Sequence, residues 1–189
     1  MQNKNIRNMT LSAIFMAMSL ILPILTGEIP QIGNMLLPMH IPVLLCGLIC
    51  GWQYGLAVGF IVPLLRSVLF GMPPLFPVAI AMAFEMAAYG CIIGFLYGHS
   101  RWKCMFSLYR SMIAAMIAGR VIWGIAMASM LGAGGGFTWQ AFIAGALLNA
   151  VPGIILQIVL IPSIMVALDR TRLVSFSKKP ERKSPVSTS

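Results

Sequence analysis

Charged side chains are scarce in this sequence, and acidic ones are the scarcest. Asp, Glu, Lys and Arg make up 9% of the 189 residues, about a third of their share in a soluble domain. Four residues are Asp or Glu, against 13 that are Lys or Arg. The hydrophobic fraction is 59%, well above the roughly 45–50% of soluble domains. These values exclude a water-soluble globule, and they exclude overall disorder, which requires low hydrophobicity and high net charge.

Most of the chain consists of continuous apolar runs. A helix needs about 20 apolar residues to cross the hydrocarbon layer, whereas barrel strands would alternate in segments of about ten. The runs predict an all-α membrane protein with six transmembrane helices, at about residues 8–26, 37–52, 54–71, 77–98, 108–131 and 138–168. Residues 1–170 would form this domain. Residues 171–189, which are basic and contain Ser and Pro, would form a disordered cytoplasmic tail.

The positions of Lys and Arg predict the orientation, because cytoplasmic loops are enriched in them. Eleven basic residues fall on one side of a six-helix arrangement: Lys4, Arg7, Arg101, Lys103, Arg110, Arg170, Arg172, Lys178, Lys179, Arg182 and Lys183. The opposite loops contain Glu28 as their one charged residue. Both termini should therefore be cytoplasmic. Membrane topology thus explains the excess of Lys and Arg, and we expect no nucleic-acid partner.

The sequence shows no recognisable catalytic or metal-binding motif. Its four cysteines, at positions 46, 50, 91 and 104, form neither a disulfide framework nor a zinc pattern, and we interpret them as packing residues. A phosphate-binding Gly-x-x-x-x-Gly-Lys-Ser/Thr loop does not occur. The two histidines fall on opposite sides of the bilayer, which argues against an intramembrane enzyme. We expect no catalytic residue, metal or cofactor.

Three charged residues, Arg66, Glu85 and Arg120, fall within predicted helices. Each would cost about 2.5–3.5 kcal/mol at a helix centre even by low estimates, so each should be paired, hydrated or in contact with a ligand. At a rise of about 1.5 Å per residue, Glu85, Arg120 and Asn149 lie roughly 12–17 Å below the outer surface. These three residues therefore share a layer. Arg66 is nearer the outer end of its helix, where its side chain can extend to the interface.

Two interpretations of this layer are open. Glu85 and Arg120 could form an interhelical ion pair that only holds two helices together. Alternatively, they line a substrate cavity, in which Arg120 and Trp123, three residues apart on one helical face, would hold a carboxylate beside an apolar wall. We favour the cavity. His40, at the outer start of the second helix, is a further candidate contact, although contact with interfacial water is the simpler explanation for it.

Small residues spaced four apart allow helices to approach closely in lipid. The sequence contains Gly55-x-x-x-Gly59, Gly90-x-x-x-Gly94-x-x-x-Gly98, Ala115-x-x-x-Gly119 and Ala13-x-x-x-Ala17. The last pair lies near the cytoplasmic side of the first helix, after a short basic segment. This context favours docking to a partner helix.

Together these features resemble the S component, the substrate-binding membrane subunit, of energy-coupling factor (ECF) transporters, over about residues 5–170. The more specific segments are Leu36 to Pro42, the Gly-Trp-Gln-Tyr-Gly turn at 51–55, and Leu65 to Pro77. They are similar to one branch of this family, which we associate with pantothenate or a related vitamin.

The resemblance implies a multi-pass subunit of an importer in the prokaryotic plasma membrane, not an enzyme. Such a subunit captures a vitamin at the external face, contacts a transmembrane coupling protein through Ala13 and Ala17, and reorients within the bilayer, driven by two ATPase subunits. In this family the substrate lies near the external face, between the first loop and helices 4 to 6. Candidate substrate contacts are Glu85, Arg120, Trp123, Asn149, His40 and Arg66. The alternative is a self-sufficient permease with Glu85 as proton carrier.

Overall fold

The computed structural model describes residues 2–25, 38–100, 104–132 and 151–170. Six α-helices occupy these residues: α1 (Gln2–Leu25), α3 (His40–Cys50), α4 (Trp52–Phe70), α5 (Ile80–His99), α6 (Met105–Leu131) and α8 (Val151–Arg170). A short π-helical segment, η1 (Leu75–Ala79), leads into α5. Counting η1 with α5, five of the helices are long and apolar enough to cross a membrane. The predicted all-α fold is confirmed.

The second helix is shorter than the sequence predicts. The apolar run at 37–52 suggested a full span, but α3 has 11 residues and is about 16 Å long, roughly half the thickness of the hydrocarbon core. It ends at Gly51, whose φ of 105° is a conformation that favours glycine. The chain then enters α4 at Trp52. Because this tight connection fixes the inner end of α3, its outer end lies at mid-depth.

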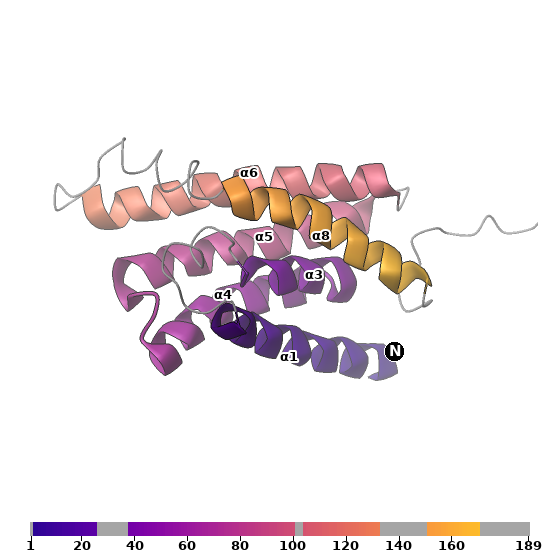
Figure 1. Cartoon of the computed structure of the whole chain (residues 1–189), viewed down its shortest axis with the longest axis horizontal. Coiled ribbons are helices and arrows are strands. Elements are labelled where there is room, and N and C mark those ends of the chain that lie inside the picture. The colour runs from indigo at the N-terminus through magenta and orange to yellow at the C-terminus, as the bar shows by residue number, and fades with distance from the viewer. Residues whose placement is uncertain (1, 26–37, 101–103, 133–150, 171–189) are drawn as a thin grey trace, which may run out of the picture.

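Successive described helices run in opposite directions. The start of α1 meets the end of α3, where Asn8 donates to the carbonyl oxygen of Cys50 at 3.2 Å, and the start of α6 lies beside the end of α8. Figure 1 shows the N-terminus and the C-terminal end of α8 at the same end of the bundle. The basic residues Lys4, Arg7, Arg110 and Arg170 belong to helix ends on this side. This arrangement agrees with the predicted orientation. The first part of the predicted sixth span, 138–150, and the predicted tail, 171–189, lie outside the described residues.

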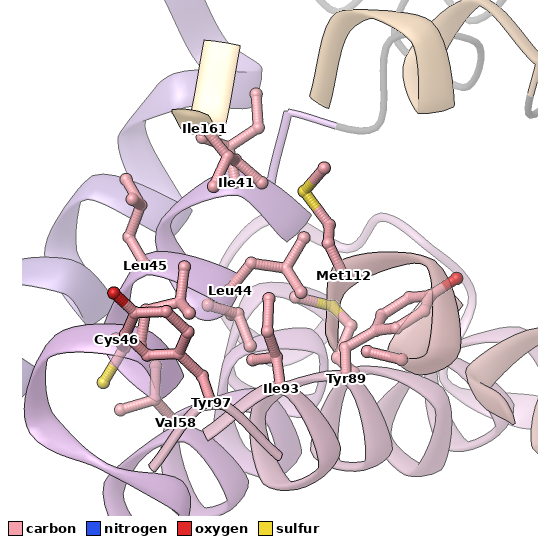
Figure 2. Packing of buried hydrophobic residues seen from close by; sticks show 14 of the residues in the cluster. Ile41, Leu44, Leu45, Cys46, Val58, Tyr89, Ile93, Tyr97, Met112 and Ile161 are labelled. Atoms are coloured by element: carbon pink, nitrogen blue, oxygen red, sulfur yellow. The ribbon is translucent and has the colours of Figure 1, made fainter. Parts of the chain in front are cut away.

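The short helix α3 forms the centre of the bundle. Ten of its 11 residues are buried. Figure 2 shows Leu44, Leu45 and Cys46 of α3 among side chains from the surrounding helices, such as Val58 of α4 and Ile93 of α5. The outer faces are apolar as well. On α6, for example, Ile117 and Ile125 are each 63% exposed, as expected where a helix faces lipid.

Glycines bring the backbones of α3, α4 and α5 into direct contact. A Cβ atom placed on Gly90 would overlap the backbone of Gly55, and one placed on Gly59 would overlap the backbone of Met86. A Cβ on Gly94 would collide with the backbone of Trp52 and with the carbonyl oxygen of Gly47. The predicted small-residue ridges of α4 and α5 are therefore their mutual interface.

Gly98 extends the same sequence pattern, but a Cβ atom added to it would lie within 4 Å of no described atom outside its own stretch of α5, so it provides a matched control. We expect Gly90→Ala to lower the thermal unfolding temperature of the detergent-solubilised chain, through an overpacking cost of about 1–3 kcal/mol. Gly98→Ala gains the same intrinsic helix propensity without the collision. Its unfolding temperature should be unchanged or slightly higher. Equal unfolding temperatures for the two variants would contradict the proposed backbone contact.

Candidate functional site

An ion pair between α5 and α6 forms the centre of the candidate site. Nη1 of Arg120 lies 3.2 Å from Oε1 of Glu85. The Glu85 side chain is 2% exposed and that of Arg120 is 16% exposed. No other ion pair joins two residues within the described part of the chain. The common depth predicted for these two residues is thus confirmed, and they do form the interhelical pair. Whether they also line a substrate cavity stays a prediction.

Tyr89 extends the pair by one helical turn. Its hydroxyl donates a hydrogen bond to Oε1 of Glu85 at 2.9 Å, so that oxygen has a cation and a neutral donor as partners. The Tyr89 ring packs against Gly119 of α6, where any side chain would collide with it. Tyr89 was not among the residues predicted from the sequence. Its position four residues after a buried acid was the available signal, because such residues share a helical face.

His40 belongs to the same cluster and does not lie at the interface. It is 1% exposed, and its ring meets the Tyr89 ring edge-on, with centroids 5.3 Å apart and an interplanar angle of 66°. The expectation that interfacial water surrounds this histidine is therefore wrong. The reason is the short α3, whose first residue lies inside the bundle. His40, Tyr89, Glu85 and Arg120 consequently form a continuous row from α3 through α5 to α6.

Arg66 has a different environment. It is only 7% exposed, so the expectation that it extends to the outer interface is also not met. Its Nε donates to the carbonyl oxygen of Met72 at 3.1 Å, and its guanidinium lies 6.0 Å from the centre of the Phe70 ring. The neighbouring Ser67 hydroxyl donates to the Pro73 carbonyl at 2.7 Å. The side chains of Arg66 and Ser67 thus stabilise the turn between α4 and η1.

The remaining candidate residues differ in what the structure shows. Trp123 lies on α6, three residues beyond Arg120 toward the outer end, and is half-buried. Asn149 lies outside the described residues. On α8, Gln157 shares a buried face with Ile161 and Met165 and is itself almost fully buried. Gln157 is thus a further polar group inside the bundle, and its side-chain nitrogen has no hydrogen-bond partner within the described residues.

The Arg120 guanidinium has capacity beyond its pair with Glu85. The group carries five N–H donors in a planar fork, and a carboxylate can engage two of them at once. Glu85 contacts Nη1, whereas the buried Nε has no hydrogen-bond partner among the described residues. One edge of the fork is thus held by the protein. The Nε edge is therefore the candidate position for a ligand, and this role stays a prediction.

The predicted docking residues lie on a second surface. Ala13 and Ala17 are exposed on α1 and line a groove of about 410 Å³ between α1 and α4. From α4, Tyr54, Ala57 and Val58 line the same groove. The small side chains leave the α1 backbone accessible there, as close packing of a further helix requires. The role of this surface in docking stays a prediction.

Comparison with known families gives a match over most of the chain. A family model described as the substrate-specific component of ECF transporters matches residues 7–165. This range includes α3, α4, η1, α5 and α6 in full, together with most of α1 and α8. No curated protein and no solved structure matches the chain.

The ion pair leads to a prediction about stability. Arg120→Met should leave the Glu85 carboxylate buried without its cation and destabilise the chain by about 3–5 kcal/mol. The double variant Glu85→Gln/Arg120→Met removes both charges and should recover a large part of this loss. Unfolding of the detergent-solubilised protein measures both values.

Arg110→Met is the matched control, because Arg110 is an exposed residue of the same helix. A substitution at such a position should change the free energy of unfolding by less than about 0.5 kcal/mol. If the double variant were as unstable as the sum of its two single variants, Glu85 and Arg120 would not be energetically coupled.

Proposed function

This chain belongs to the family of substrate-specific components of ECF transporters, and we propose that it captures a vitamin bearing a carboxylate at the external face, with pantothenate as the best candidate. Members of this family are transporter subunits of the prokaryotic membrane, not enzymes, and they work with an energising module. The substrate, its contacts and the way the chain docks are the parts that we propose.

One observation supports the choice of a carboxylate: Nε of Arg120 is buried and has no hydrogen-bond partner among the residues that the structure describes, while Glu85 holds Nη1. A carboxylate bound at that edge would form charge-assisted hydrogen bonds, which are stronger than neutral ones. Trp123 lies nearer the outer end of α6 and would provide an apolar wall along the ligand's path inward. In pantothenate, the hydroxyl and amide groups would then be left for Glu85, Asn149 and His40.

The pairing of Glu85 with Arg120 also suits a subunit that changes its orientation in the bilayer. Two opposite charges in contact present no net charge, so moving them costs less than moving either charge alone. The glycine contacts join α3, α4 and α5 through their backbones, which favours movement of the bundle as one body. The chain itself has no phosphate-binding loop. The driving energy would come from two ATPase subunits, transmitted through a transmembrane coupling protein.

The alternative function, a self-sufficient proton-coupled permease, makes a different demand on Glu85. A proton carrier must exchange its proton with water on both sides of the membrane. Glu85 is 2% exposed, and its Oε1 is bound by both Arg120 and Tyr89. This geometry supports a fixed anchor for Arg120 better than a mobile proton carrier. Uptake by vesicles that contain only this chain would support the permease.

The substrate assignment can be tested with a conservative variant. Arg120→Lys retains a cation for Glu85 but loses the planar fork. We expect its affinity for pantothenate to fall by about tenfold or more, because a hydrogen bond between charged groups contributes about 1.5–3 kcal/mol. Binding to the detergent-solubilised chain, together with mass spectrometry of co-purifying small molecules, provides the measurement.

Arg110→Lys makes the same chemical change at an exposed position and should bind like the unmodified chain. Full affinity in Arg120→Lys would remove Arg120 from the proposed site. If the unmodified chain did not bind pantothenate but co-purified with another carboxylate, the branch assignment would be wrong and the role of Arg120 would remain supported.

The docking surface makes a separate prediction. Ala13→Trp and Ala17→Trp place a large side chain in the groove between α1 and α4. We expect either variant to lose co-purification with the coupling protein while it keeps its substrate affinity, because the groove does not include the Glu85–Arg120 pair. Ile14→Trp is the control, since Ile14 is exposed on α1 but does not line the groove. Undiminished association of both alanine variants would contradict the assignment.

A further inference from the structure

A second groove lies between α6 and α8, and nothing in the proposed transport function uses it. It has a volume of about 510 Å³ and is lined by two residues of α6 and six of α8. Met105 of α6 and Val159 of α8 are exposed large hydrophobic residues that contribute to its apolar walls. Because the chain is a multi-pass membrane protein, a groove with exposed apolar walls faces the lipid.

The length of this groove corresponds to one leaflet. Along α8 it extends from Val159 to Arg170, a rise of about 16 Å at 1.5 Å per residue. The hydrocarbon core of a bilayer is about 30 Å thick, so one leaflet contributes about 15 Å. Arg170 is the last residue of α8, at the end of the bundle where the N-terminus also lies. The groove therefore covers the cytoplasmic leaflet and ends near the midplane. A lipid acyl chain fits this length, whereas a membrane-spanning partner helix would be twice as long.

The cytoplasmic end of the groove carries the polar groups. Arg170 is exposed there and forms no ion pair with any described residue. Tyr109, one turn into α6, contributes a phenol to the same groove. The nearby acid Asp169 does not line it, and the Ser163 hydroxyl is used inside α8, where it donates to the carbonyl oxygen of Val159 at 2.7 Å. The available donors are thus a cation and a phenol at headgroup level.

We propose that this groove binds one anionic phospholipid of the cytoplasmic leaflet, with an acyl chain along Val159, Pro162 and Val166 and the headgroup phosphate at Arg170 and Tyr109. The apolar walls would hold any phospholipid of suitable length. The cation favours a lipid with net negative charge, because a zwitterionic headgroup places its own cation near Arg170. Basic pockets between transmembrane helices on the cytoplasmic side are suited to such headgroups.

The test titrates two lipids into the detergent-solubilised full chain, dioleoyl phosphatidylglycerol and dioleoyl phosphatidylcholine, and follows the bound fraction by native mass spectrometry. We expect the anionic lipid to bind about fivefold more tightly, the factor that one Arg near the surface supplies. Arg170→Gln should abolish this preference and leave phosphatidylcholine binding unchanged. Ala167→Trp, which fills the groove, should weaken the binding of both lipids.

Arg110→Gln is the matched control, because Arg110 is an exposed basic residue at the same end that does not line the groove. It should retain the fivefold preference. The proposal is overturned if Arg110→Gln and Arg170→Gln reduce the preference equally, since a diffuse basic field would then explain it. It is also overturned if Ala167→Trp binds both lipids normally. Thermal unfolding without added lipid identifies any misfolded variant, and Val166→Trp, at another exposed wall position, then replaces Ala167→Trp in the same test.

Discussion

The backbone contact among α3, α4 and α5 is the constraint on which the rest of the structure depends. In lipid no hydrophobic force draws helices together, so their association rests on close van der Waals contact. Gly47, Gly55 and Gly90 allow this contact at one level of the bundle. Because α3 is held there, its short length places His40 inside the protein. Because α5 is fixed against α4 on its glycine face, its opposite side, with Glu85 and Tyr89, is directed toward α6. The position of the site is therefore a consequence of glycine packing on the other side of α5.

The ion pair between Glu85 and Arg120 constrains the structure more strongly inside the membrane than it would at a water-exposed surface. A single charge in the hydrocarbon layer is costly, and removing the partner of a buried charge costs more than the pair contributes. Glu85 and Arg120 therefore hold α5 and α6 in one register, and Tyr89 fixes the carboxylate further. A pair that served packing alone would be more stable with every donor satisfied. Nε of Arg120 has no hydrogen-bond partner in the described part of the chain, which departs from that optimum, and the proposed substrate carboxylate would explain it.

The sequence predicted the helices and the common depth of Glu85 and Arg120, because both follow from quantities that are linear along the chain: apolar length and rise per residue. It did not predict that α3 begins at mid-depth, because the apolar run at 37–52 carries no mark of its depth in the membrane. The burial of His40 was missed for that reason. The environment of Arg66 was missed because it depends on the path of the turn at 71–74, which brings the Met72 carbonyl back over α4. The contact of Tyr89 with the Glu85–Arg120 pair was missed because it depends on which face of α5 points toward α6, and hydropathy does not determine the rotation of a helix about its axis.

The two grooves occupy different sides of the bundle. Figure 1 shows α1 along one side and α6 with α8 along the other, with α3, α4 and α5 between them. The groove of Ala13 and Ala17 is formed by α1 and α4, and the groove of Arg170 by α6 and α8. A partner bound on the first side would therefore leave the second in contact with lipid. Since the Glu85–Arg120 pair joins α5 to α6, it lies away from the α1 groove and next to the α6–α8 side. Rotation of the bundle against a partner on α1 would consequently carry the site and the α6–α8 face together, and the lipid contacts at Arg170 would have to break or move with it.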